Sequence, residues 1–206
     1  PRRDDVDPAA RGAELAAAHA RFRDLHGDLA VDYHLYYTTL FMWPVVTFDW
    51  EPFLAAAALD PARFDRHFWR PWADISRRNV EALVAMGEEV VFVHDDLATS
   101  RGPVFPPAFY DRWIFPRYER ILEPAVRAGR KIVFVSDGNI DAFLERLLAL
   151  PFAGLMFENP ATPFERVLAT WGEAGRGFIG GIDTALLTRA APDAVAAHAR
   201  ETIERG

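Results

Sequence analysis

The sequence predicts an α/β fold in which parallel strands alternate with helices. Short runs of β-branched and aromatic residues recur along the chain, and a longer segment with helical periodicity follows each run. Strands that are apolar throughout are typical of parallel sheets buried on both faces. A doubly wound sheet fits this pattern, and so does part of a (β/α)8 barrel. A whole barrel usually needs ~250 residues, and the chain has 206, with about five βα units.

Five strands are expected, and two of them are strongly apolar. Val90–Val93 and Ile132–Val135 consist of β-branched residues and phenylalanine, whereas Gly154–Phe157 and Gly177–Ile179 are weaker examples. An earlier strand is predicted within Leu29–Tyr37. The connections between these parallel strands should be right-handed crossovers.

Prolines, glycines and capping residues predict where the helices begin and end. An Asp-Pro pair opens the helix at Pro61, Pro71 should kink or split that helix near Arg70, and Gly87 should end it. The predicted helices are Pro8–Arg23, Pro61–Met86, Pro106–Gly129, Asn139–Leu150, Pro163–Ala174 and Pro192–Arg205.

Composition excludes several classes of function. The net charge of -7 argues against a nucleic-acid-binding role, because binding phosphates requires a basic surface. Half of the residues are hydrophobic, which is enough to build a core. The absence of cysteine excludes disulfides, thiolate-bound zinc, iron–sulfur clusters and thiol nucleophiles. Lys131 is the only lysine, so it alone could form a Schiff base.

The chain reads as one domain, residues 1–206, in which a helical segment at 1–28 precedes the βα units at 29–206. The first residues are charged and resemble no targeting signal, and the apolar stretches are far shorter than the ~20 residues of a membrane helix. A cytoplasmic protein is therefore expected. The chain begins with Pro1 rather than methionine, which is consistent with a processed or truncated piece.

Polar residues follow four of the predicted strands directly. In α/β folds the functional site lies at the carboxyl ends of the strands, so these residues are candidates for one site. An Asp or Asn in this position can instead cap the next helix, and for Asn139 and Asp183 the two interpretations are balanced. The residues are His94, Asp95 and Asp96, then Ser136, Asp137, Gly138 and Asn139, then Glu158, and last Asp183.

Three chemistries fit such an acidic edge. The carboxylates could bind a divalent cation, bind a cationic or NH-rich ligand, or act as a general acid and base. His94, beside two carboxylates, could be a base or a metal ligand. His34, which lies among tyrosines near another strand end, is a further candidate.

At these strand ends the sequence resembles the uroporphyrinogen decarboxylase family. The likeness extends over roughly residues 29–206 and rests on four short motifs in the family's order. These are His94–Thr99 followed by Phe105–Phe109, then Phe115–Tyr118, then Phe134–Asn139, and finally Gly180–Asp183.

The resemblance implies a (β/α)8 barrel, of which this chain would be the middle and later part. It also implies cofactor-free decarboxylation of a tetrapyrrole or related small molecule, without a bound metal. On this interpretation, the catalytic residues are His94, Asp95, Asp96 and Asp137, and the substrate-binding residues are His34, Ser136, Gly138, Asn139, Glu158 and Asp183.

Two alternatives remain open. Related methyltransferases transfer methyl groups between corrinoid proteins and thiols with a zinc ion held by a His-x-Cys pair and a later Cys. The matching positions here are Val135 and Asp137, so this branch would need a divalent metal such as zinc in a site without cysteine. A noncatalytic ligand-binding subunit is the second alternative. An incomplete barrel exposes sheet edges, so a homodimer or poor solubility is expected.

Overall fold

The computed structural model describes residues 7–27 and 35–206. Within these residues, five parallel strands form the main sheet in the order β1-β2-β5-β6-β7, and two short antiparallel strands form a hairpin. The main strands are β1 (Leu35–Tyr37), β2 (Val90–His94), β5 (Lys131–Ser136), β6 (Gly154–Phe157) and β7 (Gly177–Ile179), and the hairpin strands are β3 (Ala98–Thr99) and β4 (Gly102–Pro103).

The prediction of a parallel α/β sheet is confirmed. Strands that follow one another along the chain are neighbours in the main sheet. A doubly wound sheet reverses its order at a switch point, and the described strands contain no such reversal. Of the predicted first strand, only Leu35–Tyr37 is described as strand, and residues 28–34 lie outside the described part.

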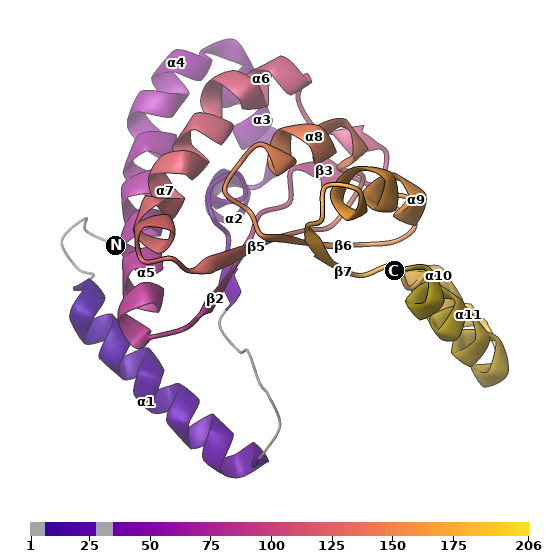
Figure 1. Ribbon diagram of the computed structural model, residues 1–206. Helices are drawn as coiled ribbons and strands as arrows, with labels where there is room; N and C mark the ends of the chain where they lie inside the picture. The colour runs from indigo at the N-terminus through magenta and orange to yellow at the C-terminus, as the bar shows by residue number, and fades with distance from the viewer. Residues whose placement is uncertain (1–6, 28–34) are drawn as a thin grey trace.

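Eleven α-helices are described, and most of them cover one side of the sheet (Figure 1). Helix α1 packs along α5, and α5 packs along α7. The helices are α1 (Pro8–His26), α2 (Trp43–Phe48), α3 (Trp50–Leu59), α4 (Pro61–Phe64), α5 (Arg70–Met86), α6 (Pro107–Trp113), α7 (Phe115–Arg127), α8 (Leu144–Leu148), α9 (Phe164–Val167), α10 (Thr184–Arg189) and α11 (Pro192–Arg205).

Prolines interrupt two of the long predicted helices, and the interruption expected near Arg70 is confirmed. A π-helical turn at Asp65–Trp69 separates α4 from α5, just before Pro71. Since proline lacks an N–H group and its ring crowds the preceding turn, the regular hydrogen-bond ladder cannot continue there. Pro116 in the same way follows the break at Ile114 between α6 and α7.

Two other helices differ from their predicted bounds. The helix predicted from Asn139 begins at Leu144, after a 3-10 turn over residues 141–143. The helix predicted at 163–174 is α9 followed by a π-helical turn at Leu168–Gly172. No helix in residues 7–27 and 35–206 combines the length and the apolar character needed to cross a bilayer.

The face of the sheet that meets the helices forms the core. Because side chains alternate along a strand, every second residue points toward the helical layer. Val93, Phe134 and Leu155 lie side by side in the register on this face, and each is 0% exposed. Helices α2 and α3 were not predicted from the sequence, and α3 extends the core through Phe53, whose ring contacts Phe41 in the loop before α2.

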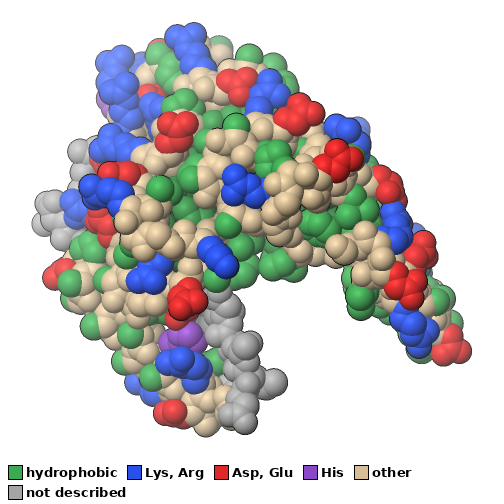
Figure 2. All heavy atoms as spheres, in the orientation of Figure 1, with side chains coloured by type: hydrophobic (Ala, Val, Ile, Leu, Met, Phe, Trp, Pro, Cys, Tyr) green, Lys and Arg blue, Asp and Glu red, His purple; other side chains and the backbone are tan. Residues whose placement is uncertain are grey.

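The opposite face of the sheet is apolar but open. Phe92 and Val133 are paired in the register there and are only partly buried, while Met156 is 41% and Ile179 47% exposed. A cavity of about 430 Å³ lies against this face, with Lys131 at its edge. Figure 2 shows the hollow beneath the sheet, between the α1 side of the molecule and the α10–α11 side.

Candidate functional site

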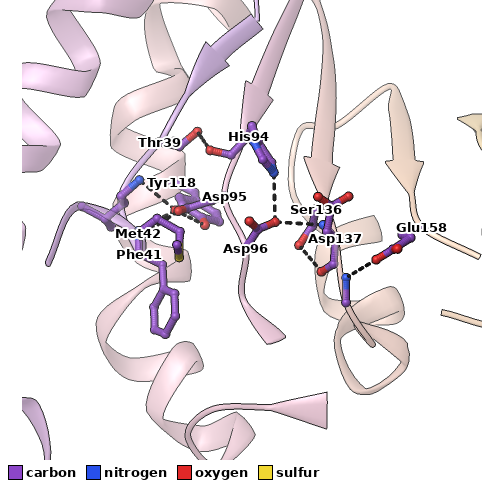
Figure 3. Close-up of polar contacts among 12 residues, drawn as sticks. Thr39, Phe41, Met42, His94, Asp95, Asp96, Tyr118, Ser136, Asp137 and Glu158 are labelled. Carbon is purple, nitrogen blue, oxygen red and sulfur yellow. Dashed lines mark hydrogen bonds and ion pairs between the residues drawn. The ribbon is translucent and has the colours of Figure 1, made fainter. Parts of the chain in front are cut away.

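Three of the predicted site residues meet at the carboxyl ends of β2 and β5. His94 Nε2 lies 2.9 Å from Asp96 Oδ1, and the backbone N–H of Asp137 donates to the same oxygen at 2.9 Å. One ligand atom from each of His94, Asp96 and Asp137 can be chosen so that all three lie within 4.8 Å of one another. Figure 3 shows these side chains gathered between the two strand ends. We call them the His94–Asp96–Asp137 cluster.

Residue alternation places this cluster on the open side of the sheet. His94 is paired with Val135 in the register, and both lie on the same face as Met156. Asp96 and Asp137 come two residues after His94 and Val135, so they continue on this side where the strands end. The cluster therefore lies at the rim of the open apolar face, where the strands end.

The cluster shifts the proton affinities of its own members. Burial would lower the pKa of His94, but the hydrogen bond and charge of Asp96 outweigh it and the pKa is raised. Burial would raise the pKa of Asp96, but the hydrogen bonds from His94 and from the N–H of Asp137 outweigh it and the pKa is lowered. The two shifts favour an ion pair of imidazolium and carboxylate.

Asp137 is the member whose carboxyl group holds its proton most readily. Its pKa is raised by burial and by the negative charge of Asp96, with a smaller contribution from Glu158. Oε2 of Glu158 accepts a hydrogen bond from the N–H of Gly138 at 3.4 Å, which places Glu158 beside the cluster from the end of β6. A carboxyl of raised pKa next to an ionised carboxylate is a suitable arrangement for general acid–base chemistry.

Asp95 points the other way, into the core. Its side chain is 1% exposed, and Figure 3 shows it directed toward Tyr118 and the loop after β1 rather than toward Asp96. The Tyr118 hydroxyl donates to Asp95 Oδ2 at 2.7 Å. Burial raises the pKa of Asp95 to about 6, opposed by the hydrogen bonds that its carboxylate accepts. Asp95, which was expected from the sequence to be a catalytic residue, is thus out of reach of solvent.

The remaining residues of the Ser-Asp-Gly-Asn turn shape the site. Ser136 is 0% exposed, and its hydroxyl lies within the turn, 3.3 Å from the Asp137 carbonyl oxygen. Gly138 has a φ of 78°, and a Cβ there would lie 2.4 Å from the carbonyl oxygen of Ala98 in the β3–β4 hairpin. Only glycine fits this contact. Asn139 Oδ1 accepts from the N–H of Asp141, so Asn139 stabilises the turn.

Asp183 caps a helix rather than joining the cluster. Its carboxylate accepts from the N–H groups of Ala185 and Leu186 at the start of α10. This is the capping interpretation that the sequence analysis left open for Asp183. His34 lies outside the described residues.

Some residues that support the strand ends were not identified from the sequence. Tyr118 was noted only as part of a motif, and the loop at residues 39–42 was not given any role in the site. Asn159 donates through its side-chain amide to the Gly181 carbonyl oxygen at 2.8 Å and so links the ends of β6 and β7. In the sequence, the feature that could have indicated this role is the position of Asn159, which follows Glu158 directly after an apolar strand.

The donor set of the cluster suits a divalent cation held by one imidazole and two carboxylates. It differs from the thiolate zinc site of the methyltransferases considered above, because the positions that would carry thiolates or their partner are Val135 and Asp137.

No protein-family model matches the chain, and no curated protein sequence matches it either. The resemblance to the uroporphyrinogen decarboxylase family therefore rests on the short motifs quoted above.

Proposed function

We propose that this chain carries out cofactor-free decarboxylation of a tetrapyrrole or a related carboxylate-bearing small molecule, in the manner of uroporphyrinogen decarboxylases. The proposed fold is a (β/α)8 barrel of which the five strands form a part, and the proposed setting is the cytoplasm. The observation that carries the proposal is the His94–Asp96–Asp137 cluster at the carboxyl ends of adjacent parallel strands, on the rim of an apolar face.

Decarboxylation places simple demands on such a site. The carbon–carbon bond to the carboxylate breaks, CO2 leaves, and a proton takes its place on carbon. A carboxyl group whose pKa is raised by burial and by a neighbouring carboxylate is a better proton donor than an ordinary aspartate, and Asp137 meets this condition. The His94–Asp96 pair would hold the NH groups or the charge of the substrate in place. The partly exposed Phe92, Val133 and Ile179 would contact its apolar ring system.

A metal-dependent methyl transfer is the second candidate, and the observation that favours it is the same donor set. A divalent cation on His94, Asp96 and Asp137 would supply a Lewis acid at the rim. Such an enzyme would also be expected to bind a corrinoid protein.

The experiment is an anaerobic incubation of the protein with uroporphyrinogen, with the products identified by mass, in the presence and absence of EDTA. We expect loss of CO2 that EDTA does not affect, and a loss of at least about a hundredfold in rate in Asp137→Asn, as is typical when a general acid is removed. Asp111→Asn is the matched control, because Asp111 is an exposed carboxylate paired with Arg146.

Other results would redirect or refute the proposal. Titration calorimetry with zinc and magnesium measures metal binding directly. Tight binding that Asp96→Asn abolishes, together with no decarboxylation, would favour the methyl-transfer candidate. Equal rates in Asp137→Asn and Asp111→Asn would contradict the role of Asp137. Binding of the tetrapyrrole without turnover would point to the noncatalytic ligand-binding subunit.

A further inference from the structure

The carboxylate of Asp95 is surrounded by donors that come from other parts of the chain. Its donors are the N–H groups of Leu40, Phe41 and Met42, at 2.7, 2.5 and 2.8 Å, and the hydroxyl of Tyr118 at 2.7 Å. Asp95 and Tyr118 are almost completely buried, so these contacts lie away from the protein surface. The carboxylate is thus held entirely by hydrogen bonds within the protein.

The loop before α2 forms a concave row of backbone donors. Three consecutive N–H groups that converge on one carboxylate form a nest, a backbone arrangement that favours a bound anion. Thr38, with a φ of 71°, turns the chain at the start of this loop. A neutral amide in the same place would turn its NH2 group toward some of these donors, so a carboxylate matches the loop geometry better than an amide does.

The same loop is attached to the backbone of the candidate site. The N–H and the hydroxyl of Thr39 both donate to the carbonyl oxygen of His94, at 2.8 and 3.0 Å. The hydroxyl of Ser76 on α5 donates to the Thr39 carbonyl oxygen at 2.5 Å. A displacement of the loop would therefore move the backbone of His94, whose ring faces Asp96 on the other side of the sheet.

We propose that Asp95 is a positioning residue whose negative charge holds residues 38–42 against the end of β2 and thereby sets the place of His94. The nest that it occupies would accept a free small carboxylate once the Asp95 side chain is removed. This inference does not depend on which reaction the site performs, since it concerns the placement of His94 alone.

The test compares Asp95→Ala, Asp95→Asn and Asp96→Asn by nuclear magnetic resonance at neutral pH, in sodium formate and in sodium chloride of equal ionic strength. We expect the amides of Leu40, Phe41 and Met42 to exchange about ten- to a hundredfold faster in Asp95→Ala in chloride, as hydrogen bonds to a charged group are lost. Formate should restore slow exchange and return the His94 ring signals to their wild-type positions.

Asp95→Asn keeps the shape without the charge, so its exchange should stay fast in both salts. Asp96→Asn is the matched control, because it removes the neighbouring carboxylate from the opposite side of the sheet and should leave the three amides unchanged. Formate should not alter the wild type.

Two results would overturn the inference. Exchange in Asp95→Asn as slow as in the wild type would refute the need for charge. A folded Asp95→Ala variant that responds equally to formate and chloride would refute the nest. If Asp95→Ala is unfolded in chloride, its refolding in formate supports the inference. If it is unfolded in both salts, the amide exchange of Asp95→Asn decides whether the charge is needed.

Discussion

The two faces of the sheet use neighbouring carboxylates in opposite ways. Asp95 lies on the covered face, where four protein donors surround it and its side chain is buried. Asp96 lies on the open face, where it shares its Oδ1 with His94 and with the N–H of Asp137 (Figure 3). One step along the chain therefore separates a buried structural anion from a carboxylate that can meet a substrate.

An acidic residue that follows a strand is therefore not in itself evidence of a functional site. Alternation makes neighbouring residues point to opposite faces of the sheet, and the helices packed on one face then determine which of the two carboxylates is covered. The same rule distinguishes the apolar residues, because Phe134 is 0% exposed whereas Met156, on the open face of the next strand, is 41% exposed. Three measurements test this difference between the two faces.

The largest expected effect is on stability. Phe134→Ala should lower the free energy of unfolding by roughly 3–5 kcal/mol, because it leaves a cavity in the covered face. Met156→Ala, on the open face, should lower it by less than about 1 kcal/mol, since that side chain is already partly in solvent. Urea denaturation measures both. Equal losses would mean that something covers the open face as tightly as the helices cover the other.

The second effect concerns self-association, which we propose occurs through the open face. Exposed apolar surface and unpaired sheet edges favour association, and Met156 and Ile179 are prominent on this face. The double variant Met156→Lys and Ile179→Lys should weaken association at least about tenfold, because two charges would have to be desolvated. Sedimentation equilibrium measures this.

Leu59→Lys is the control for association. Leu59 is 86% exposed at the end of α3, away from the sheet. A monomeric wild type, or an equal response to Leu59→Lys, would argue against association through the sheet face and against the incomplete barrel.

The smallest effect is the pH dependence of the His94–Asp96 pair. The folded-state pKa of His94 is raised above 6.5, so its contribution to stability is complete below 6.5 and is lost as the pH rises through the folded value. The pKa of Asp96 is lowered below 3.8, so its contribution is complete above 3.8 and is lost as the pH falls through the folded value. The pair should therefore stabilise the protein most between these two pH values.

Asp96→Asn should consequently cost more stability at pH 5 than at pH 9, by roughly 1 kcal/mol. Urea denaturation of the wild type and the variant at both pH values measures the difference. Asp95, with its pKa raised to about 6, contributes stability that falls as the pH rises from about 4 to about 6, but it is present in both proteins and cancels. A cost that does not change with pH would mean that the pair is not charged.

Much of the fold could be predicted from the sequence, because the strands and helix ends depend on local signals. The apolar runs at 90–93 and 132–135 are strands, and Gly87 ends α5 in a left-handed conformation. The π-helical turn before Pro71 could not be predicted in detail, because proline breaks the ladder but packing selects the geometry. Helices α2 and α3 also escaped prediction, since their aromatic residues are stabilised by distant contacts such as Phe53 with Phe105.

For the candidate site, the sequence alone was enough to identify which side chains follow the strand ends. It placed His94, Asp96 and Asp137 directly after apolar strands, and parallel pairing then brings those ends to one edge. Only the tertiary structure decided that Asp95 turns inward while Asp96 turns outward. The reason is physical: the loop at 40–42 and Tyr118 come from distant parts of the chain, and only their donors make burial of the Asp95 charge tolerable.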